Sequence, residues 1–252
     1  MSVPRSPADG STCGRAQTER PVGRVAALWR YPVKSMAPES LEDVEVSWHG
    51  LAGDRRWAFV REGVVASGFP WLTIRERSDM VGFRPSFLDP GRPDASPTVV
   101  RTPAGECLQV TDPALAAQLG HGVALIKQNR GVFDSMPLSL ITTQSVDGLG
   151  ALVGGELDVK RFRPNLVIEA TSGADFPEDA WIGSVLRIGA MRMRVDEHDR
   201  RCVVVNVDPA TEKRNPTILR AIARERDACL GVYGSTVEPG AVAVGDPVTL
   251  VG

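Results

Sequence analysis

The sequence is poor in the residues that build common metal centres and covalent cross-links. Its 252 residues include four cysteines and three histidines, with no CxxC pair and no HExxH pattern. These absences argue against an ordinary zinc site. They also argue against a disulfide framework, which a chain of this length does not need. We therefore expect reduced thiols.

The sequence also lacks long apolar runs and an excess of charge of one sign. No apolar segment approaches the roughly 20 residues of a membrane-spanning helix, so we expect no integral membrane segment. The 29 basic and 31 acidic residues give a net charge of -2. This provides no general attraction for nucleic acid or an anionic membrane, so any anion site must be local. Residues 1–21 lack the apolar core of a secretory signal, which predicts a flexible tail and a cytoplasmic protein.

Short apolar runs separated by turn residues predict a mixed, β-rich α+β protein. Asp112 and Pro113 have the N-cap and first-turn pattern of a helix that ends at Gly120. We place a domain boundary there, which gives a β-barrel-like N-terminal domain over 22–112 and a second, β-rich domain with a few helices over 113–252.

Further elements are expected on both sides of this boundary. One helix should begin near Ser145 and another near Pro216. Two alternating runs around the turn at 245–247 predict a closing hairpin over 240–250. Strands are expected at 25–29, 44–48, 57–60, 64–66, 98–100, 108–110, 123–126, 138–141, 166–168, 185–188, 191–195, 202–207 and 248–251.

Cys202 is the residue on which we centre a functional hypothesis. It follows Arg200 and Arg201 and opens an apolar, β-branched run, so nearby positive charge favours its thiolate at a strand entrance. Such a thiolate is a soft metal ligand or a nucleophile. A small buried side chain at the start of a core strand is the alternative. His198 lies four residues earlier, and we interpret it as an exposed loop residue rather than a catalytic partner.

Other segments place cations, hydroxyls or an amide next to predicted strand ends. Guanidinium and amide groups ahead of the strand at 166–168 can present fixed donors to a phosphate or a heteroaromatic edge. Hydroxyls before the helix near Ser145 lie where helix N-terminal amides favour anions. Solvated surface arginines and helix capping are the alternatives. The candidates are Lys34, Ser35, Arg55, Thr142, Thr143, Arg163 and Asn165.

Five motifs, taken in order, resemble the MOSC domain family. They are YPVKSM, GDRRW, RFRPN, RCVVVNVDP and AVAVGDPVTL. The resemblance is to the two-part form, in which an N-terminal β-barrel domain precedes the MOSC domain, and which includes the mitochondrial amidoxime-reducing component and bacterial relatives. It extends from about Val22 to Val251 and implies a barrel-like MOSC domain. It also implies a molybdenum cofactor, a pyranopterin dithiolene with a phosphate, whose metal is ligated by one protein cysteine.

Carried over motif by motif, the resemblance makes Cys202 the molybdenum ligand and the catalytic residue. It assigns the pterin and its phosphate to Lys34, Ser35, Arg55, Arg163, Asn165 and Arg201, with Thr142 or Thr143. Arg200 is a departure, because reductase relatives often have a small serine at that position. The arginine adds bulk and charge beside the phosphate.

The resemblance further implies a reductase that removes oxygen from a small N-hydroxylated substrate, such as an amidoxime or a hydroxylamine. Four scattered cysteines do not form an iron–sulfur motif, and we expect no ferredoxin-like extension after Gly252. We therefore expect a separate electron-donor protein of the ferredoxin, flavin or cytochrome type. MOSC domains also occur fused to cofactor sulfurases. A non-redox carrier of sulfur or cofactor therefore remains an alternative, and so does a scaffold that has lost the cofactor site.

Overall fold

The computed structural model describes residues 19–64 and 68–251. Most of the predicted tail, and two residues of the predicted strand at 64–66, lie outside these described residues. The predicted tail extends too far, to residue 21, because residues 19–21 already belong to the first strand. They are paired there with residues 249–251.

Apart from 64–66 and 202–207, every predicted strand overlaps an observed one. The strands are β1 (Glu19–Arg30), β2 (Glu39–Leu41), β3 (Asp43–Ser47), β4 (Gly50–Leu51), β5 (Trp57–Arg61), β6 (Arg84–Phe87), β7 (Thr98–Arg101), β8 (Cys107–Gln109), β9 (Val123–Lys127), β10 (Leu138–Thr142), β11 (Leu166–Ala170), β12 (Val185–Ile188), β13 (Met191–Arg200), β14 (Cys229–Glu238), β15 (Gly240–Ala243) and β16 (Pro247–Val251). The α-helices are α1 (Pro113–Leu119), α2 (Thr143–Val153) and α3 (Thr217–Arg226). Short 3₁₀-helices are η1 (Ser78–Gly82), η2 (Val159–Phe162), η3 (Pro177–Trp181) and η4 (Val203–Asn206).

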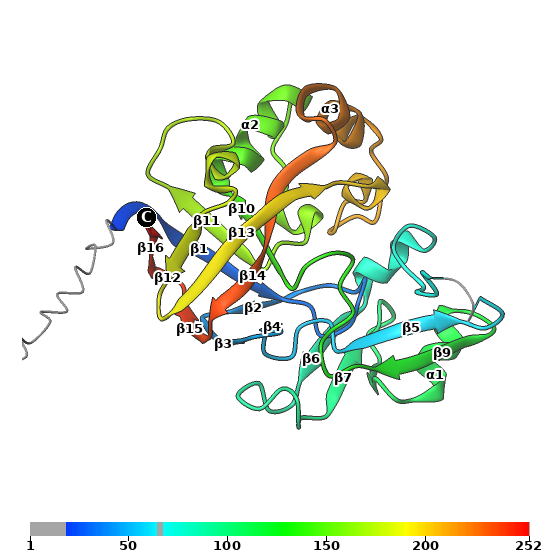
Figure 1. Ribbon diagram of the computed structural model, residues 1–252. Helices are drawn as coiled ribbons and strands as arrows, with labels where there is room; N and C mark the ends of the chain where they lie inside the picture. The colour runs from blue at the N-terminus through cyan, green and yellow to red at the C-terminus, as the bar shows by residue number, and fades with distance from the viewer. Residues whose placement is uncertain (1–18, 65–67, 252) are drawn as a thin grey trace, which may run out of the picture.

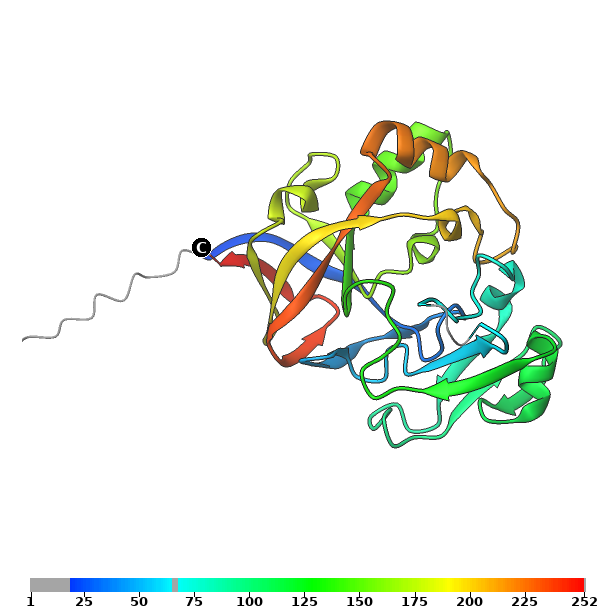
Figure 2. The ribbon, with the colours of Figure 1, turned by 45° about the vertical axis from the view of Figure 1, so that its right-hand side comes forward.

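A closed barrel of seven strands dominates the molecule (Figures 1 and 2). Its order is β11-β10-β14-β13-β12-β16-β1, and β1 closes the ring by pairing with β11. The β10–β11 pair is parallel, because α2 carries the chain back between these strands, and the other pairs are antiparallel. The predicted β-rich mixed fold is confirmed.

Alternation along β10 and β11 divides the apolar side chains between two cores. Leu140 and Ile168 point into the barrel interior. Ile141 and Val167 point outward instead, into a second core under α2 and α3. The period of two in a strand thus attaches the helical layer to the barrel wall.

Strand β1 runs unusually close to its neighbour β11. A Cβ atom added at Gly23 would lie 2.6 Å from the carbonyl oxygen of Glu169 and 2.8 Å from a side-chain carbon of Ile168. Since this contact is with backbone, a larger residue at position 23 would force the two strands apart. The glycine therefore permits the pairing that closes the barrel.

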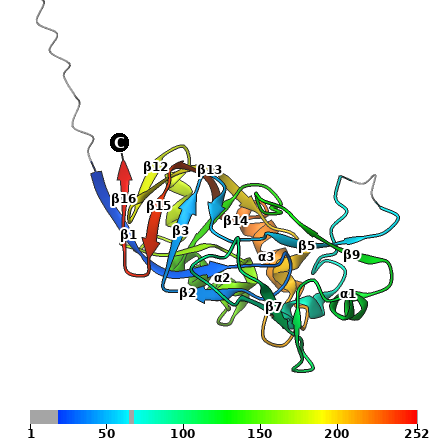
Figure 3. The ribbon, with the colours of Figure 1, turned by 90° about the horizontal axis from the view of Figure 1, so that it is seen from below.

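The remaining N-terminal elements form smaller sheets at the other end of the molecule (Figure 3). Strands β5 and β9 pair with each other, and β6, β7 and β8 form a three-stranded sheet. Helix α1 packs against them through Leu115 and Leu119. Strands β1 and β2, by contrast, lie in the barrel sheet, and β3 pairs with β15. The boundary at residue 112 stays a prediction of domain organisation, because the tertiary structure interleaves the two segments.

The predicted closing hairpin over 240–250 is wrong. The turn exists, but β15 pairs with β3 while β16 pairs with β1 and β12. The turn thus moves the chain from one sheet to another, and no β15–β16 ladder forms. Alternation predicts that a residue is in a strand, whereas the identity of the partner strand depends on the rest of the fold.

The predicted helices are confirmed, and so is the capping role of Asp112 at the first of them. The side chain of Asp112 accepts a hydrogen bond from the backbone N–H of Ala114. The side chain of Asn215 likewise accepts from Thr217 at the start of α3. Ile218 and Ile222 form the buried face of α3. Within the described ranges, no helix combines the length and the apolar character needed to cross a bilayer.

Candidate functional site

A cavity of about 540 Å³ lies where the N-terminal elements meet the barrel. Its wall combines the turn after β1, the approach to β5, the segment before β10, the residues between η2 and β11, and the end of β13. The cavity brings together seven of the predicted site residues. They are Lys34, Ser35, Arg55, Arg163, Asn165, Arg201 and Cys202.

Thr142 and Thr143 do not line this cavity. Thr142 is fully buried, where its hydroxyl accepts a hydrogen bond from the N–H of Ser145 and donates one of 2.6 Å to Glu178. Thr143 is the first residue of α2 and makes its side-chain contact with Gln144. The geometry therefore favours a helix-capping role for Thr142, and neither threonine is available to a ligand in this cavity.

Cys202 lines the cavity, but the strand predicted over 202–207 is wrong. Strand β13 ends at Arg200, and Cys202 immediately precedes the 3₁₀-helix η4. The ladder with β14 ends at the pair Arg200 and Cys229, and among the described residues 202–207 only Val207 forms a bridge, an isolated one with Arg214. Val205 then packs against the helical layer and Val207 against the N-terminal core. This burial on two sides overrides the strand preference of a valine run.

Three of the lining residues have the left-handed backbone that side chains seldom adopt. The φ angles are 69° at Ser35, 49° at Arg55 and 54° at Arg163. Such conformations destabilise a non-glycine residue and persist where the surroundings enforce them. Their concentration in one cavity supports a functional role for its shape.

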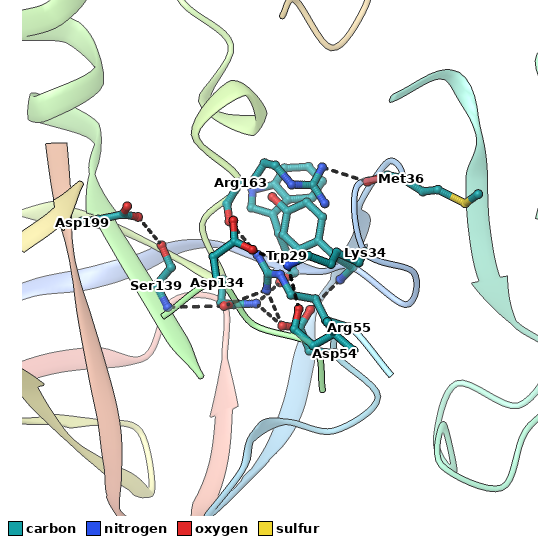
Figure 4. A network of polar contacts seen from close by, with 12 residues as sticks. Trp29, Lys34, Met36, Asp54, Arg55, Asp134, Ser139, Arg163 and Asp199 are labelled. Atoms are coloured by element: carbon teal, nitrogen blue, oxygen red, sulfur yellow. Dashed lines mark hydrogen bonds and ion pairs between the residues drawn. The ribbon is translucent and has the colours of Figure 1, made fainter. Parts of the chain in front are cut away.

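Asp54 is the buried centre of the polar network behind the cavity (Figure 4). Its carboxylate accepts from the N–H of Tyr31 at 2.8 Å and from the amide of Asn165 at 3.1 Å, and it forms an ion pair with Arg55. The second amide hydrogen of Asn165 goes to the carbonyl of Trp29. Because both donor directions of Asn165 are used, this residue orients the network instead of offering a donor to a ligand.

Tyr31 lies between two guanidinium groups. The centre of its ring is 4.6 Å from the guanidinium carbon of Arg55 and 4.3 Å from that of Arg163. Burial raises the pKa of the Tyr31 hydroxyl, so the ring stays neutral and acts as a flat support. Burial also lowers the pKa of Arg163 to about 10, which leaves the side chain cationic at neutral pH. This arrangement holds two cations next to each other.

Arg201 is held almost rigidly at the barrel end. Its Nε donates to the carbonyl of Leu230 and its Nη1 to that of Phe162, each at 2.7 Å, and Nη1 also lies 2.8 Å from Asp199. Gly231 makes room for the group, since a Cβ there would lie 3.1 Å from Nη2 of Arg201. The guanidinium is therefore fixed in position before any ligand arrives.

The cavity wall contains buried donors that have no acceptor within the described part of the chain. They include Nη2 of Arg163, Nη2 of Arg201 and Nε of Arg161. Seven cationic side chains line the cavity, and three carboxylates accompany them. The cations are Lys34, Arg55, Arg75, Arg161, Arg163, Arg200 and Arg201, and the carboxylates are Asp134, Glu197 and Asp199. Unused donors and excess positive charge fit an anionic ligand.

Sequence reasoning missed several residues that face Cys202 and Lys34. Arg75 lies beside Cys202 in the cavity wall, and it is 3.1 Å from a carboxylate oxygen of Asp134. Burial opposes the charge of Arg75, yet Cys202 and Asp134 together raise its pKa. Asp134 also forms an ion pair with Lys34, whose pKa burial lowers. Arg75 and Asp134 lie in segments without a local motif, so the sequence carried no signal for them.

Asp199 is the second group that the sequence did not indicate. Its side chain is 2% exposed and accepts hydrogen bonds from Ser139 at 3.3 Å and from Tyr233. Burial raises the pKa of Asp199 to about 6, although Arg201 acts in the opposite direction. The cavity therefore contains a carboxyl group that exchanges its proton near pH 6.

Replacing Asp199 with asparagine is expected to flatten the pH dependence of folding stability. The folded-state pKa of about 6 exceeds the ordinary 3.8, so the folded chain holds this proton more tightly than the unfolded chain. The resulting stabilisation is greatest below about pH 4 and is lost as the pH rises through 6. From pH 4.5 to pH 7.5 this stabilisation of the parent protein falls by on the order of 2 kcal/mol. Urea unfolding of both proteins at these pH values measures it, and an identical pH dependence would contradict the assignment.

Comparisons with known families and proteins agree with this geometry. Residues 22–117 match the family described as MOSC N-terminal beta barrel domain, and residues 127–249 match the MOSC domain. The human mitochondrial amidoxime-reducing component 1 is 25% identical over 92% of this chain and 84% of its own length. The human mitochondrial amidoxime reducing component 2 is 26% identical, over 90% and 83%. A molybdenum cofactor sulfurase from Drosophila mojavensis is 26% identical over 87% of this chain, which spans 32% of that protein.

Among solved structures, the YUAD protein from Bacillus subtilis has the same fold. The superposition gives a TM-score of 0.53 at 11% identity and covers 93% of this chain and 98% of that one. This likeness concerns the fold alone. The two matched domains together account for both the barrel and the N-terminal sheets, and the chain therefore belongs to the MOSC domain family, with a MOSC N-terminal beta barrel domain ahead of the MOSC domain.

Proposed function

We propose that this protein binds a molybdenum cofactor in the cavity of about 540 Å³ and reduces N-hydroxylated small molecules, such as amidoximes or hydroxylamines. Support for the substrate class comes from the amidoxime-reducing relatives, which align with most of the chain. Support for the cofactor comes from the sulfurase, whose name includes it.

The donor set of the cavity is the observation that carries the proposal. Cys202 provides a thiolate, which is a soft ligand of the kind that sulfur-bound metals favour. Arg163 and Arg201 each have one buried N–H without an acceptor among the described residues, and fixed guanidinium donors suit a phosphate. A pyranopterin dithiolene that carries a metal and a phosphate therefore fits the residues present.

The roles of the lining residues follow from what each one already contacts. Cys202 would ligate the metal, and Arg163 and Arg201 would hold the phosphate. Lys34 and Ser35 would contact the pterin from the N-terminal side. Arg55 and Asn165 are engaged with Asp54 and with each other at 3.3 Å, so we assign them a positioning role. The bound cofactor would supply a metal that takes up two electrons and delivers them to the substrate.

Reduction of an N-hydroxylated compound breaks one N–O bond, consumes two protons and two electrons, and releases the oxygen as water. The electrons come from a separate donor protein in this proposal. Asp199 is suited to store one proton in the cavity wall, and the hydroxyl of Tyr233 is hydrogen-bonded to it. Arg201 would hold the anion throughout, because the carbonyls of Leu230 and Phe162 keep it in position even when Asp199 is protonated.

A direct test starts with the protein purified from cells that synthesise the cofactor. Molybdenum per chain is measured by mass spectrometry, and reduction of benzamidoxime is measured with reduced methyl viologen as an artificial donor. Near-stoichiometric metal with turnover is the expected result. A folded protein without metal would contradict the proposal.

A non-redox carrier of sulfur or molybdenum cofactor is the second candidate function. It is favoured by the similarity to a molybdenum cofactor sulfurase, which covers 87% of this chain. The same experiment separates the two functions. Bound molybdenum without turnover of any N-hydroxylated compound, whichever donor is used, would support the carrier.

A further inference from the structure

A second cavity of about 240 Å³ lies behind the arginines of the first. Four residues line both cavities, so the two spaces share a wall: Ile74, Arg161, Arg163 and Val204. The other lining residues are Trp29, Ala37, Pro38, Val81, Arg84, Lys160, Val207 and Pro209. Neither Cys202 nor any other cysteine is among them.

The charge in this second cavity is of one sign. Arg84, Lys160, Arg161 and Arg163 line it, and no carboxylate does. Two of these cations have a carboxylate partner outside the cavity lining. Asp208 lies 2.7 Å from Arg161, and Asp158 lies 3.1 Å from Lys160. Arg84 and Arg163 form no ion pair within the part of the chain that the structure describes. Two positive charges therefore remain without compensation.

The wall also contains buried donors that lack an acceptor among the described residues. They are Nε of Arg161, Nη2 of Arg163 and Nε1 of Trp29. The Arg161 side chain is 6% exposed, and its Nη1 donates to the carbonyl of Val205. Nη1 of Arg163 donates to the carbonyl of Met36 at 2.9 Å, immediately before the lining residues at 37 and 38. Both guanidinium groups are thus fixed with one donor each to spare.

The rest of the wall is apolar. It is formed by Trp29, Ala37, Pro38, Ile74, Val81, Val204, Val207 and Pro209. The volume is below the roughly 300 to 1,000 Å³ that is usual for sites of drug-sized ligands. A ligand that fits must therefore be small, apolar over most of its surface and anionic at one end.

We propose that the second cavity binds a small amphipathic carboxylate, with the carboxylate group at Arg161, Arg163 and Trp29 and the apolar body against the valines and prolines. Arg84 and Lys160 line this cavity alone, whereas Nη2 of Arg163 is also the donor that we assign to the phosphate in the first cavity, so the two anions would compete for it. Arg161 and Arg163 line both cavities, so a carboxylate bound here neutralises positive charge that would otherwise attract an anion into the larger cavity. Anions in the two cavities therefore weaken each other's binding reciprocally.

The test uses the full chain purified without cofactor and two probes of the same shape. Calorimetric titration compares 4-bromobenzoate with the uncharged 4-bromobenzamide. We expect the carboxylate to bind at least about 10-fold more tightly, since only it gains charge-assisted hydrogen bonds. Equal affinities, or no binding of the carboxylate, would overturn the proposal. Neither outcome bears on molybdenum binding, so the two proposals fail separately.

Variants and a crystal soak then locate the probe. Arg84→Gln and Lys160→Gln change residues that line only the second cavity, and each should weaken 4-bromobenzoate binding by about 3- to 10-fold. Arg75→Gln is the matched control in the first cavity and should leave the affinity unchanged. The anomalous signal of bromine is expected between Trp29 and Val207. A signal in the larger cavity, or a loss of affinity confined to Arg75→Gln, would overturn the assignment.

Discussion

Replacing Cys202 with alanine is expected to remove nearly all bound molybdenum from protein produced in cells that make the cofactor, while the fold survives. The thiolate next to Arg75 is the metal ligand in our proposal, and alanine offers no donor atom. Cys202 is partly exposed at the start of η4, so the substitution leaves no large buried cavity. Molybdenum per chain and the unfolding midpoint are the two measurements.

Cys229 provides a matched control, because it lines the same cavity. Burial raises the pKa of its thiol, which disfavours the thiolate, and its sulfur lies 3.5 Å from the carbonyl of Asp227. The Cys229→Ala protein should therefore keep its molybdenum. If Cys202→Ala keeps its full metal content, Cys202 is not the ligand. If only Cys229→Ala loses its metal, the ligand is Cys229.

Replacing Asp54 with alanine is expected to destabilise the protein by about 3 to 5 kcal/mol, the range for breaking a buried ion pair from one side. Asp54 is fully buried and accepts from Tyr31 and Asn165 as well as pairing with Arg55. Its removal leaves the Arg55 cation without its carboxylate and the N–H of Tyr31 without its acceptor. Guanidinium chloride unfolding measures the loss of free energy.

An exposed aspartate paired with a neighbouring arginine gives the control for this effect. Asp89 contacts Arg92 at 2.8 Å, and the two side chains are 43% and 80% exposed. Asp89→Ala should therefore change the unfolding free energy by no more than about 1 kcal/mol. If both variants lose the same unfolding free energy, the buried network stabilises the fold no more than an exposed ion pair does. If Asp54→Ala is as stable as the parent protein, the network does not hold the cavity wall.

Most of the predicted residues line one cavity because they are grouped in short motifs at turns and strand ends. Lys34 and Ser35 lie in one proline-containing turn, and Arg163 lies directly before a buried strand. Turns and strand ends are where side chains leave the sheet, so chemistry concentrated there indicates a site. The structure brings these motifs into one cavity although they are separated by more than 100 residues.

Some roles could not be read from these motifs. The motif around Asn165 suggested a ligand donor, but the amide is occupied by Asp54 and by the carbonyl of Trp29. Thr142 looked like an anion-binding hydroxyl and is buried against Glu178. In each case the partner comes from a distant segment, and only that partner decides whether a polar group is available to a ligand.

The sequence alone determined most of the strands, the three helices and most of the residues that carry the candidate chemistry, since these depend on local periodicity and residue type. It did not indicate β2, β4, β6 or β14, although β14 lies in the barrel. The tertiary structure decided the strand pairing. It joined β15 to β3 instead of β16, and it turned the valines after Cys202 into a 3₁₀-helix. It also placed Asp199 and Arg75 in the cavity. Pairing and burial depend on contacts between distant segments, and no local pattern encodes those contacts.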